Sequence, residues 1–433
     1  MSNLESISIK ATSNSLRATV QLTGSKSESN RALIMRAMSG GKVDVRNLSK
    51  AADTVTLTEI LEHWELEGGS NNEGNRENPL LQTASHKLIN VGPAGTAMRF
   101  LTAYAAMQPT DITLSGSQRM QERPVGILVD ALRNLGADIT YQAAEGYPPL
   151  KIKGPIVQTT RHISIKGNIS SQYISALLLI APRLPLGIEL KIEGDLTSKP
   201  YVDMTLAMLE QAGIRHEWDA NVIVIEPQEF HNSVINVEPD WSAASYWYAI
   251  AALSEKAAFF LPGLNAYSLQ GDSQITEIMA NFGITSQFKD GGVYLEKEPK
   301  PLLRKFFDFK DCPDLAQTVI VCCAALGHDA TFTGLETLRI KETDRVRALQ
   351  TELEKIGVKL IEKNQACKLD CSGLHFPEQV TISTYEDHRM AMAFAPLALK
   401  VNQLIIEDPA VVNKSYPGYW DDLTRAGLVN ELL

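Results

Sequence analysis

The chain has 433 residues, of which 44% are hydrophobic and 21% charged, a balance that excludes a disordered chain and predicts two or three domains. Its formal net charge of −10 at pH 7 excludes nucleic acid and anionic membranes as main partners, because phosphate-rich surfaces attract basic proteins. The sequence has no long apolar run and its first residues do not form a secretory signal, so we expect a cytoplasmic protein.

A regular series of glycines runs along the chain. Each follows a helix-like segment by a few residues and precedes an apolar or β-branched run, and the five are Gly136, Gly213, Gly283, Gly357 and Gly427. Successive glycines lie 70 to 77 residues apart. Each is expected to end a helix, because glycine adopts the left-handed conformation at little cost. Residues 53–63, followed by Gly68 and Gly69, look like a degenerate sixth copy.

Six helix-and-strand units predict an α/β fold, although such junctions are common in proteins of this class. The polar stretch 68–79 is expected to be an exposed loop. A domain boundary is expected at 239–242, where a strand-like run at 234–237 gives way to an apolar helix at 243–253. Three units then lie on either side, and a cleft between two domains is the expected ligand site.

The first half contains several turns that suit anions. Residues 24–31, GSKSESNR, lead into a helix predicted at 32–38, and residues 92–99, GPAGTAMR, open a second one. Backbone N–H groups at a helix start bind phosphate or carboxylate, and Lys26 adds a positive charge. Arg123 follows in a loop that ends at Pro124. Ordinary helix capping and a solvated loop are the alternatives at these positions.

Two later segments of this half supply uncharged donors at helix starts. Ser170, Ser171 and Gln172 precede an apolar helix predicted at 176–180, and residues 198–203, SKPYVD, begin another. Hydroxyl and amide groups suit a polyol or its phosphate. Helix capping explains both segments equally well.

In the second half, Asp314 precedes an apolar helix that runs to Ala325, and an N-cap is its alternative role. The alternating charges of residues 339–345, RIKETDR, precede a helix predicted at 346–356, where a helix start laced with ion pairs is the alternative. Residues 385–392, YEDHRMAM, and a loop around Lys414 complete the series.

Basic residues therefore recur at the junctions of predicted elements. They are Lys26, Arg123, Lys341, Arg345, Arg389 and Lys414. Such a set suits an enzyme that handles two phosphorylated, carboxylated small molecules. The five cysteines form no CxxC pair, no His lies at metal-ligand spacing from them, and no cofactor fingerprint occurs, so we expect reduced thiols, no metal and no cofactor.

Taken together these segments resemble the 5-enolpyruvylshikimate-3-phosphate synthase family. The matching motifs are GSKSESNRAL, GPAGTAMRFL, RMQERP, SSQY, SKPY, the Asp314 turn, KETDR, DHRMAM and the Lys414 loop. They stand in the family's order from residue 22 to about residue 420. The resemblance implies an α/β fold of two inside-out barrel domains, each of three βαβαββ units, with residues 21–239 as one domain and 1–20 plus 240–433 as the other.

The same resemblance implies a transferase of the shikimate pathway, which leads to chorismate and the aromatic amino acids, and it implies a monomer. Its substrates would be shikimate 3-phosphate and phosphoenolpyruvate. The shikimate 3-phosphate contacts would fall on Lys26, Ser27, Arg31, Ser170, Ser171, Gln172, Ser198, Tyr201, Asp314 and Lys341. The phosphoenolpyruvate contacts would fall on Lys26, Gly95, Arg123, Gln172, Arg345, Arg389 and Lys414.

The implied reaction is an addition followed by an elimination. The shikimate 5-hydroxyl attacks C2 of phosphoenolpyruvate while C3 gains a proton, and phosphate then leaves. Asp314 is the expected base on the hydroxyl. The proton at C3 is expected to pass through one of four side chains, which are Glu342, Lys341, Lys26 and His388.

Two positions depart from the family pattern. Pro93 and Thr337 stand where the family usually has Asn, which affects the fine contacts to the substrates.

One alternative is the UDP-N-acetylglucosamine enolpyruvyl transferase family, which usually carries a Cys in its mobile loop, whereas residues 115–124 have none. The other alternative is a non-catalytic anion-binding protein on the same fold.

Overall fold

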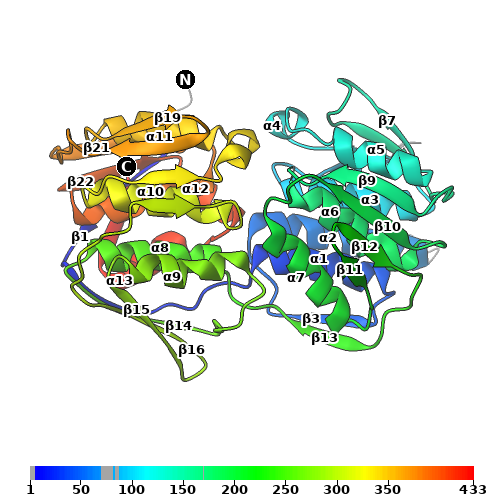
Figure 1. Cartoon of the computed structure of the whole chain (residues 1–433), viewed down its shortest axis with the longest axis horizontal. Helices are drawn as coiled ribbons and strands as arrows, with labels where there is room; N and C mark the ends of the chain where they lie inside the picture. Colours follow the sequence, from blue (N-terminus) through cyan, green and yellow to red (C-terminus); the bar gives the residue numbers. More distant parts are fainter. Residues whose placement is uncertain (1–4, 70–80, 83–86, 169) are drawn as a thin grey trace. The chain divides into compact units, whose positions relative to one another are not determined.

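The computed structural model describes residues 5–69, 81–82, 87–168 and 170–433 (Figure 1). The chain forms two compact units, a central unit of residues 24–237 and a terminal unit of residues 1–23 and 238–433. Most of the loop predicted at 68–79 lies outside the described residues. No helix in the described ranges is long and apolar enough to cross a membrane.

The described part of the central unit contains three sheets. The first has the order β4 (Leu81–Gln82), β5 (Lys87–Asn90), β6 (Asp111–Ser115), β8 (Leu150–Lys153), β7 (Asp138–Tyr141). The second has the order β11 (Glu217–Asp219), β12 (Val222–Ile225), β10 (Ile188–Glu193), β9 (His162–Lys166). The third pairs β13 (Ser233–Asn236) with β3 (Val43–Arg46). The helices are α1 (Lys26–Met38), α2 (Ala52–Gly69), α3 (Gly95–Met107), α4 (Gln118–Gln121), α5 (Gly126–Leu135), α6 (Ser171–Ile180) and α7 (Lys199–Gln211).

The described part of the terminal unit also contains three sheets. Their orders are β21 (Gln379–Ile382), β22 (Gln403–Glu407), β1 (Ser6–Ala11), β23 (Leu428–Leu432); then β15 (Ile284–Lys289), β16 (Gly292–Lys297), β14 (Lys256–Pro262), β2 (Ser15–Thr19); and β17 (Phe306–Asp308), β18 (Thr331–Thr333), β20 (Ala366–Asp370), β19 (Lys359–Lys363). The helices are α8 (Trp241–Leu253), α9 (Ile275–Ala280), α10 (Ala316–Ala325), α11 (Arg345–Glu354), α12 (His388–Phe394) and α13 (Tyr419–Ala426).

One strand-and-helix pattern recurs in both units. In the central unit β9, α6, β10, α7, β11 and β12 follow one another, β9 runs parallel to β10, and β12 runs antiparallel to it. In the terminal unit β17, α10, β18, α11, β19 and β20 repeat this order with the same strand directions. The predicted α/β class with βαβαββ units is therefore confirmed. The degenerate sixth copy corresponds to α2, which follows β3 of the two-stranded sheet in sequence, and α2 continues through the glycines expected to end it.

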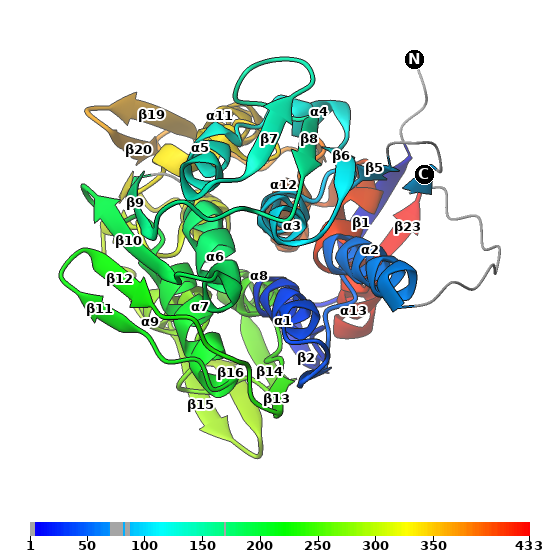
Figure 2. The same cartoon turned by 90° about the vertical axis from the view of Figure 1, so that its right-hand side faces the viewer.

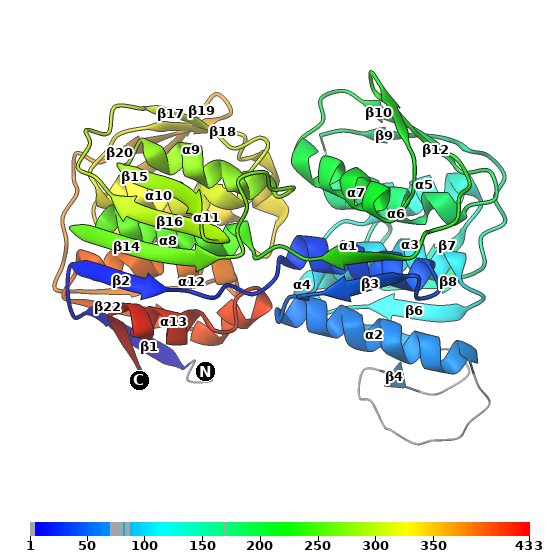
Figure 3. The ribbon, with the colours of Figure 1, turned by 90° about the horizontal axis from the view of Figure 1, so that it is seen from below.

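Each unit places three helices at its centre. Helices α1, α3 and α6 contact one another in the central unit, and α8, α10 and α12 do so in the terminal unit. Every residue of α8 except Ser242 is buried, because an apolar sequence on all sides of a helix needs cover all round. Figures 1 and 3 show the sheets of each unit on the outside of these helices, and Figure 2 shows α1 and α3 nearly end-on. This arrangement brings the starts of several helices together in each unit.

The glycine series marks the ends of helices, as the sequence predicts. Gly136 and Gly427 cap α5 and α13 with φ values of 111° and 101°. Gly213, Gly283 and Gly357 follow the ends of α7, α9 and α11 and also have positive φ. At Gly136 a Cβ atom would in addition lie 2.0 Å from the carbonyl oxygen of Val157, so only glycine fits there.

Candidate active site

The starts of α8, α10, α11 and α12 meet in the terminal unit and carry a group of charged side chains. We call this group the charge cluster; its members are Asp314, Lys341, Glu342, Arg345, Asp387, Arg389 and Lys414. Each of these helices has the positive end of its dipole at its start, where Asp240, Asp344 and Asp387 cap α8, α11 and α12. The place therefore favours anions even before the side chains are counted.

Arg345 is the centre of the charge cluster, and its side chain is only 2% exposed. Its Nε donates to Oδ2 of Asp387 at 2.7 Å and its Nη1 to Oδ1 of Asp314 at 3.0 Å, while Nη2 lies 3.0 Å from Oε2 of Glu342. Burial alone would lower the pKa of this guanidinium, but the three carboxylates outweigh burial and raise the pKa. Arg345 is therefore charged at every pH at which the protein is folded.

Asp314 joins Arg345 to Arg389. Its Oδ2 lies 2.9 Å from Nη2 of Arg389 and its Oδ1 lies 4.0 Å from Nζ of Lys341. The alternative role as a helix cap is wrong, because neither the short 3₁₀ turn Pro313–Leu315 nor α10 has a side-chain cap. The carboxylate instead faces three cations of the cluster.

Glu342 is held by two cations, one on each oxygen. Lys414 lies 2.9 Å from Oε1 and Arg345 lies 3.0 Å from Oε2. The ion pair between residues 342 and 345 is the one that the alternating charges of the sequence suggest at a helix start. The contacts of Arg345 to Asp387 and Asp314 go beyond that alternative, since they join separate segments of the chain. His388 is buried beside Asp387, with its Nδ1 3.6 Å from Oδ1 of Asp387.

Arg389 is fixed by neutral groups as well as by Asp314. Its Nη1 donates to the hydroxyl of Tyr246 and its Nη2 to Oγ of Ser242, both at 3.3 Å. Burial raises the pKa of Tyr246 to about 12, even though Arg389 acts in the opposite sense. The phenol is therefore neutral around pH 7 and contributes a hydrogen bond rather than a charge.

The starts of α1, α3, α6 and α7 meet in the central unit. We call this group the helix-end cluster; its members are Lys26, Ser27, Arg31, Thr96, Ser170, Ser171, Gln172, Ser175, Ser198, Tyr201 and Thr205. Arg31 of α1 is its most buried cation. Its Nε donates to Oγ1 of Thr205 at 2.7 Å, and its Nη2 donates to Oγ of Ser175 at 2.9 Å. It also bonds the backbone oxygens of Ser27 at 2.8 Å and Tyr201 at 3.2 Å. Burial lowers the pKa of Arg31 to about 10, so the residue remains a cation at neutral pH and ties three helices together.

Two other contacts link the helix starts of the central unit. Nζ of Lys26 lies 3.3 Å from Oδ2 of the buried Asp53, which follows the start of α2. The side-chain amide of Gln172 in α6 donates to Oγ1 of Thr96 in α3 at 3.2 Å. The predicted groups of four separate segments therefore come together.

Gly95 and Arg123 lie against each other. A Cβ atom at Gly95 would stand 2.8 Å from Nη1 of Arg123, so the guanidinium lies directly over this glycine. Arg99 and Tyr173 fix the following turn, because Nη2 of Arg99 and the hydroxyl of Tyr173 donate to the oxygen of Pro124 at 2.7 Å and 2.5 Å. The segment before Pro124, predicted as a loop, contains the short helix α4, which Ser117 caps.

The serines at the other helix starts differ in role. Ser170 accepts a hydrogen bond from the backbone N–H of Gln172, so the capping alternative holds for it. Ser198 has a left-handed backbone with φ of 56° and makes no side-chain cap, so capping does not explain it. Ser171 is buried at the first position of α6.

Comparison with known proteins decides between the functions that such clusters could serve. A family model described as EPSP synthase (3-phosphoshikimate 1-carboxyvinyltransferase) matches residues 10–423. The chain belongs to the EPSP synthase family. Like the family, it is an enzyme of the shikimate pathway that transfers the enolpyruvyl group of phosphoenolpyruvate to shikimate 3-phosphate. The resemblance inferred from the motifs is confirmed.

Individual relatives agree with this assignment. The 3-phosphoshikimate 1-carboxyvinyltransferase of Bacteroides fragilis is 46% identical over 415 residues, which cover 95% of this chain and 96% of the relative. That of Neisseria meningitidis is 35% identical over 420 residues, which cover 93% and 94%.

Solved structures support the EPSP synthase fold. The EPSP synthase of Acinetobacter baumannii has a TM-score of 0.74 at 20% identity and covers 99% of this chain and 100% of its own. An enolpyruvyl transferase of Streptomyces tendae has a TM-score of 0.71 at 15% identity and covers 100% and 99%. At these identities the two structures speak for the fold alone.

Sequence reasoning missed several residues of this EPSP synthase family member. Asp387 stands inside the motif DHRMAM, yet only His388 and Arg389 of that motif were assigned a role. A carboxylate before an apolar helix looks like a cap, and Asp387 does cap α12 by accepting from the N–H of Arg389 at 2.9 Å. Its second task, the contact with Arg345, depends on tertiary structure. Asp53 was also missed, because its contact with Lys26 depends on tertiary structure as well.

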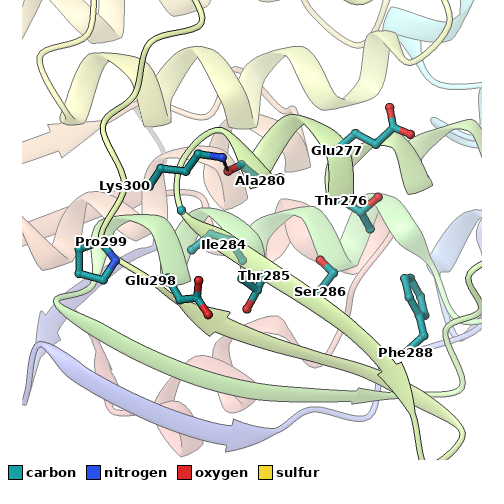
Figure 4. Close-up of a pocket in the computed structure, with 11 residues that line it drawn as sticks. Thr276, Glu277, Ala280, Ile284, Thr285, Ser286, Phe288, Glu298, Pro299 and Lys300 are labelled. Carbon is teal, nitrogen blue, oxygen red and sulfur yellow. Dashed lines mark hydrogen bonds between the residues drawn. The ribbon is translucent and has the colours of Figure 1, made fainter.

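A pocket of about 660 Å³ lies elsewhere in the terminal unit, between α9, β15 and the segment after β16 (Figure 4). It is lined by the carboxylates Glu277 and Glu298, and its one cation, Lys300, donates to the backbone oxygen of Ala280 at 3.2 Å. None of the predicted site residues lines it. Its charge does not suit the anionic substrates of the EPSP synthase family.

Proposed function

We propose that the charge cluster and the helix-end cluster are the parts of the chain that bind and convert the two substrates. The observation that carries this proposal is the position of Asp314, a carboxylate in contact with Arg345 and Arg389 and 4.0 Å from Lys341. A base for the shikimate hydroxyl and cations for the anionic donor must lie close together, so the short distances between Asp314 and these cations support the proposal.

The helix-end cluster supplies donors that suit shikimate 3-phosphate. Its proposed contacts are Lys26, Ser27, Arg31, Ser170, Ser171, Gln172, Ser198 and Tyr201, with Asp314 and Lys341 from the terminal unit. Arg31 gives most of its donors to the protein, so we propose that it acts chiefly by holding Ser27 and Tyr201 in place. Hydroxyl and amide groups at helix starts match the hydroxyls and the phosphate of this substrate.

Phosphoenolpyruvate carries a phosphate and a carboxylate and needs cations. Its proposed contacts are Lys26, Gly95, Arg123, Gln172, Arg345, Arg389 and Lys414. Arginine offers paired N–H groups that fit both anions. Gly95 contributes by leaving room, since a side chain there would meet Arg123.

In the proposed reaction Asp314 accepts the proton of the 5-hydroxyl of shikimate 3-phosphate. At the same time the oxygen of that hydroxyl bonds to C2 of phosphoenolpyruvate. C3 gains a proton in this step and loses one when phosphate leaves, so no net proton is consumed at C3. Glu342, Lys341, Lys26 and His388 stay the candidates for transfer at C3. The contacts of Glu342 with Lys414 and Arg345 support Glu342, because they fix both of its oxygens beside the proposed donor site.

The test is phosphate release by the purified protein. It is expected only when shikimate 3-phosphate and phosphoenolpyruvate are both present, and Asp314→Asn is expected to reduce turnover by about 10²-fold or more. Asp311→Asn is the matched control, because Asp311 is exposed and lies three residues away in the same segment. Normal turnover in a folded Asp314→Asn variant would remove Asp314 as the base. Absence of release with both substrates would favour the non-catalytic alternative.

We further propose that the protein acts in the cytoplasm as a monomer, with small molecules rather than nucleic acid or membranes as its partners. The net charge of −10 supports the exclusion of anionic partners. Light scattering on the purified protein, with a mass of 47.6 kDa for the monomer, tests the oligomeric state.

A further inference from the structure

A buried carboxylate that the reaction does not use, Asp272, lies directly behind the charge cluster. It is 3% exposed and belongs to the 3₁₀ turn Gly271–Gln274, between β14 and α9. The preceding residue locks this turn to the start of α8. The side chain of Gln270 accepts from the N–H of Trp241 and donates to the oxygen of Pro239, both at 2.9 Å. The position of the carboxylate is therefore fixed by the fold.

Ser242, in the first turn of α8, connects Asp272 to Arg389. Its hydroxyl donates to Oδ2 of Asp272 and lies 3.3 Å from Nη2 of Arg389. A guanidinium can only donate, and a hydroxyl has a single hydrogen. Arg389 therefore donates to Ser242, and Ser242 donates to Asp272 when that carboxylate is ionised.

The same nitrogen of Arg389 lies 2.9 Å from Oδ2 of Asp314. Arg389 is thus held from two sides, by the proposed base in front and by the Ser242 hydroxyl behind. In the proposed reaction the carboxylate of Asp314 turns to the substrate hydroxyl, which would weaken its contact with Arg389. The contact through Ser242 and Asp272 does not depend on the substrate and keeps the guanidinium in place.

The charged and titratable groups around Asp272 are known from each neighbouring element. Asp314 and the thiol of Cys312 precede α10, Arg389 begins α12, and Asp240 caps α8. Burial is the main cause that raises the pKa of Asp272, to about 7, and Asp314 acts in the same sense, while Arg389 opposes it. Burial likewise raises the pKa of Cys312, so that the thiol stays neutral. Asp272 is the member of this group whose charge changes near pH 7.

We propose that Asp272 is a positioning residue for enolpyruvyl transfer, which acts through Ser242 to hold Arg389 toward phosphoenolpyruvate. This inference rests on the proposed role of Arg389 in binding that substrate. Ionised Asp272 adds a negative charge behind the donor site and so weakens the attraction for an anion, while the hydrogen bond with Ser242 can form in both protonation states. The Michaelis constant for phosphoenolpyruvate is therefore expected to carry a component that rises with pH between 6 and 8 through Asp272.

The first variant is Ser242→Ala, which removes the connection and leaves both charges. It is expected to raise the Michaelis constant for phosphoenolpyruvate about 10-fold and to change that for shikimate 3-phosphate less than twofold. Ser254→Ala is the matched control, because Ser254 is a buried hydroxyl beyond the other end of α8 that bonds only the oxygen of Ile250 among the described contacts. This control is expected to behave like the wild type.

The second variant is Asp272→Asn, which keeps an acceptor for Ser242 and removes the titration. The ratio of its Michaelis constant for phosphoenolpyruvate to that of the wild type is expected to fall severalfold between pH 6 and pH 8. Titration of the substrate itself cancels in this ratio. The proposal would be overturned if both variants had the wild-type Michaelis constant for phosphoenolpyruvate and if the ratio of the Asp272→Asn value to the wild-type value did not change with pH. An equal rise of the constants for both substrates, with a lower melting temperature, would also overturn it, since that is the mark of a purely structural role.

Arg389→Lys separates this inference from the proposed function. If Arg389→Lys raises the Michaelis constant for phosphoenolpyruvate while Ser242→Ala and Asp272→Asn do not, only the proposed role of Asp272 is wrong. If Arg389→Lys leaves that constant unchanged, the proposed donor site itself is wrong.

Discussion

The two clusters solve the same problem, the binding of anions at helix starts, with different side chains. In the terminal unit three carboxylates, Asp314, Glu342 and Asp387, surround Arg345. In the central unit Arg31 is equally buried but bonds two hydroxyls and two backbone oxygens. The charge cluster pairs its buried arginine directly with carboxylates, whereas the buried arginine of the helix-end cluster bonds neutral oxygens and has the carboxylate of Glu28 nearby.

The difference matches the proposed division of work. A reaction that moves protons needs carboxylates close to cations, and burying such charges is tolerable only when each is paired. Recognition of a polyol phosphate needs donors and net positive charge but no proton acceptor. Single substitutions in the carboxylate-rich charge cluster should therefore change turnover. Substitutions in the other cluster should change binding.

After Asp314→Asn, the largest effect is expected for Asp387→Asn. Asp387 contacts Arg345 with both oxygens and is fully buried, so loss of its charge leaves a buried cation with weaker partners. We expect turnover to fall by about 10²-fold and stability to fall by about 3 kcal/mol. Chemical denaturation and steady-state kinetics measure the two. The exposed neighbour Glu386→Gln is the control. Unchanged turnover would mean that Arg345 is held well enough by the other two carboxylates.

Arg31→Lys tests the other side of the comparison. Lysine cannot reproduce the forked contacts to Thr205, Ser175 and the two backbone oxygens. The Michaelis constant for shikimate 3-phosphate is expected to rise about 10-fold while turnover at saturation changes little. Arg36→Lys, on the same helix and partly exposed, is the control. A fall in turnover with an unchanged Michaelis constant for shikimate 3-phosphate would contradict the proposed division of work between the clusters.

Sequence reasoning reached the parts of the molecule that local patterns encode. The glycine series and the apolar helices at 243–253 and 316–325 correspond to real elements, since a helix end and a fully buried helix each leave a local mark. Helix starts were placed too late at residues 32 and 176, where α1 and α6 begin at Lys26 and Ser171. Polar first turns hide a helix start when the polar residues are buried instead of facing solvent, as Glu28, Ser29 and Ser171 are.

Contacts between distant segments could not be predicted in this way. The approach of Asp387 to Arg345 joins residues 42 positions apart, and that of Ser242 to Arg389 joins residues 147 positions apart. Nothing in the residues around Asp272 distinguishes it from an ordinary turn aspartate. Its burial and its neighbours follow only from the way the turn packs against α8.

Gly95→Ala sharpens the comparison at the donor side of the central unit. The new methyl group would stand 2.8 Å from Nη1 of Arg123, so the guanidinium must move. Glyphosate is an inhibitor that, by the family resemblance, occupies the donor site and is longer than phosphoenolpyruvate. We expect a severalfold rise of the Michaelis constant for phosphoenolpyruvate, a larger rise of the inhibition constant for glyphosate, and little change of the Michaelis constant for shikimate 3-phosphate. Gly418→Ala is the control, because the atom nearest its new methyl group lies 3.8 Å away. Equal changes of all three constants would show that the fold, and not the donor site, was disturbed.

The smallest effect concerns the stability of the terminal unit and its dependence on pH. The pKa of Asp272 is raised from 3.8 to about 7, mainly by burial. Below pH 3.8 the carboxyl is protonated in the folded and the unfolded chain. As pH rises toward 7, the unfolded chain gives up this proton first, so unfolding becomes easier, and the contribution of Asp272 to stability is lost by about pH 7.

Asp272→Asn has no such proton. Its melting temperature relative to that of the wild type is therefore expected to rise by a few degrees between pH 5 and pH 8. The exposed Asp311→Asn is expected to show a constant difference over the same range. Calorimetric scans at four pH values measure the difference in melting temperature between Asp272→Asn and the wild type. A difference that stays flat or falls as the pH rises would contradict the prediction. It would mean that the carboxylate is ionised throughout, because Arg389 stabilises its charge more strongly than burial opposes it.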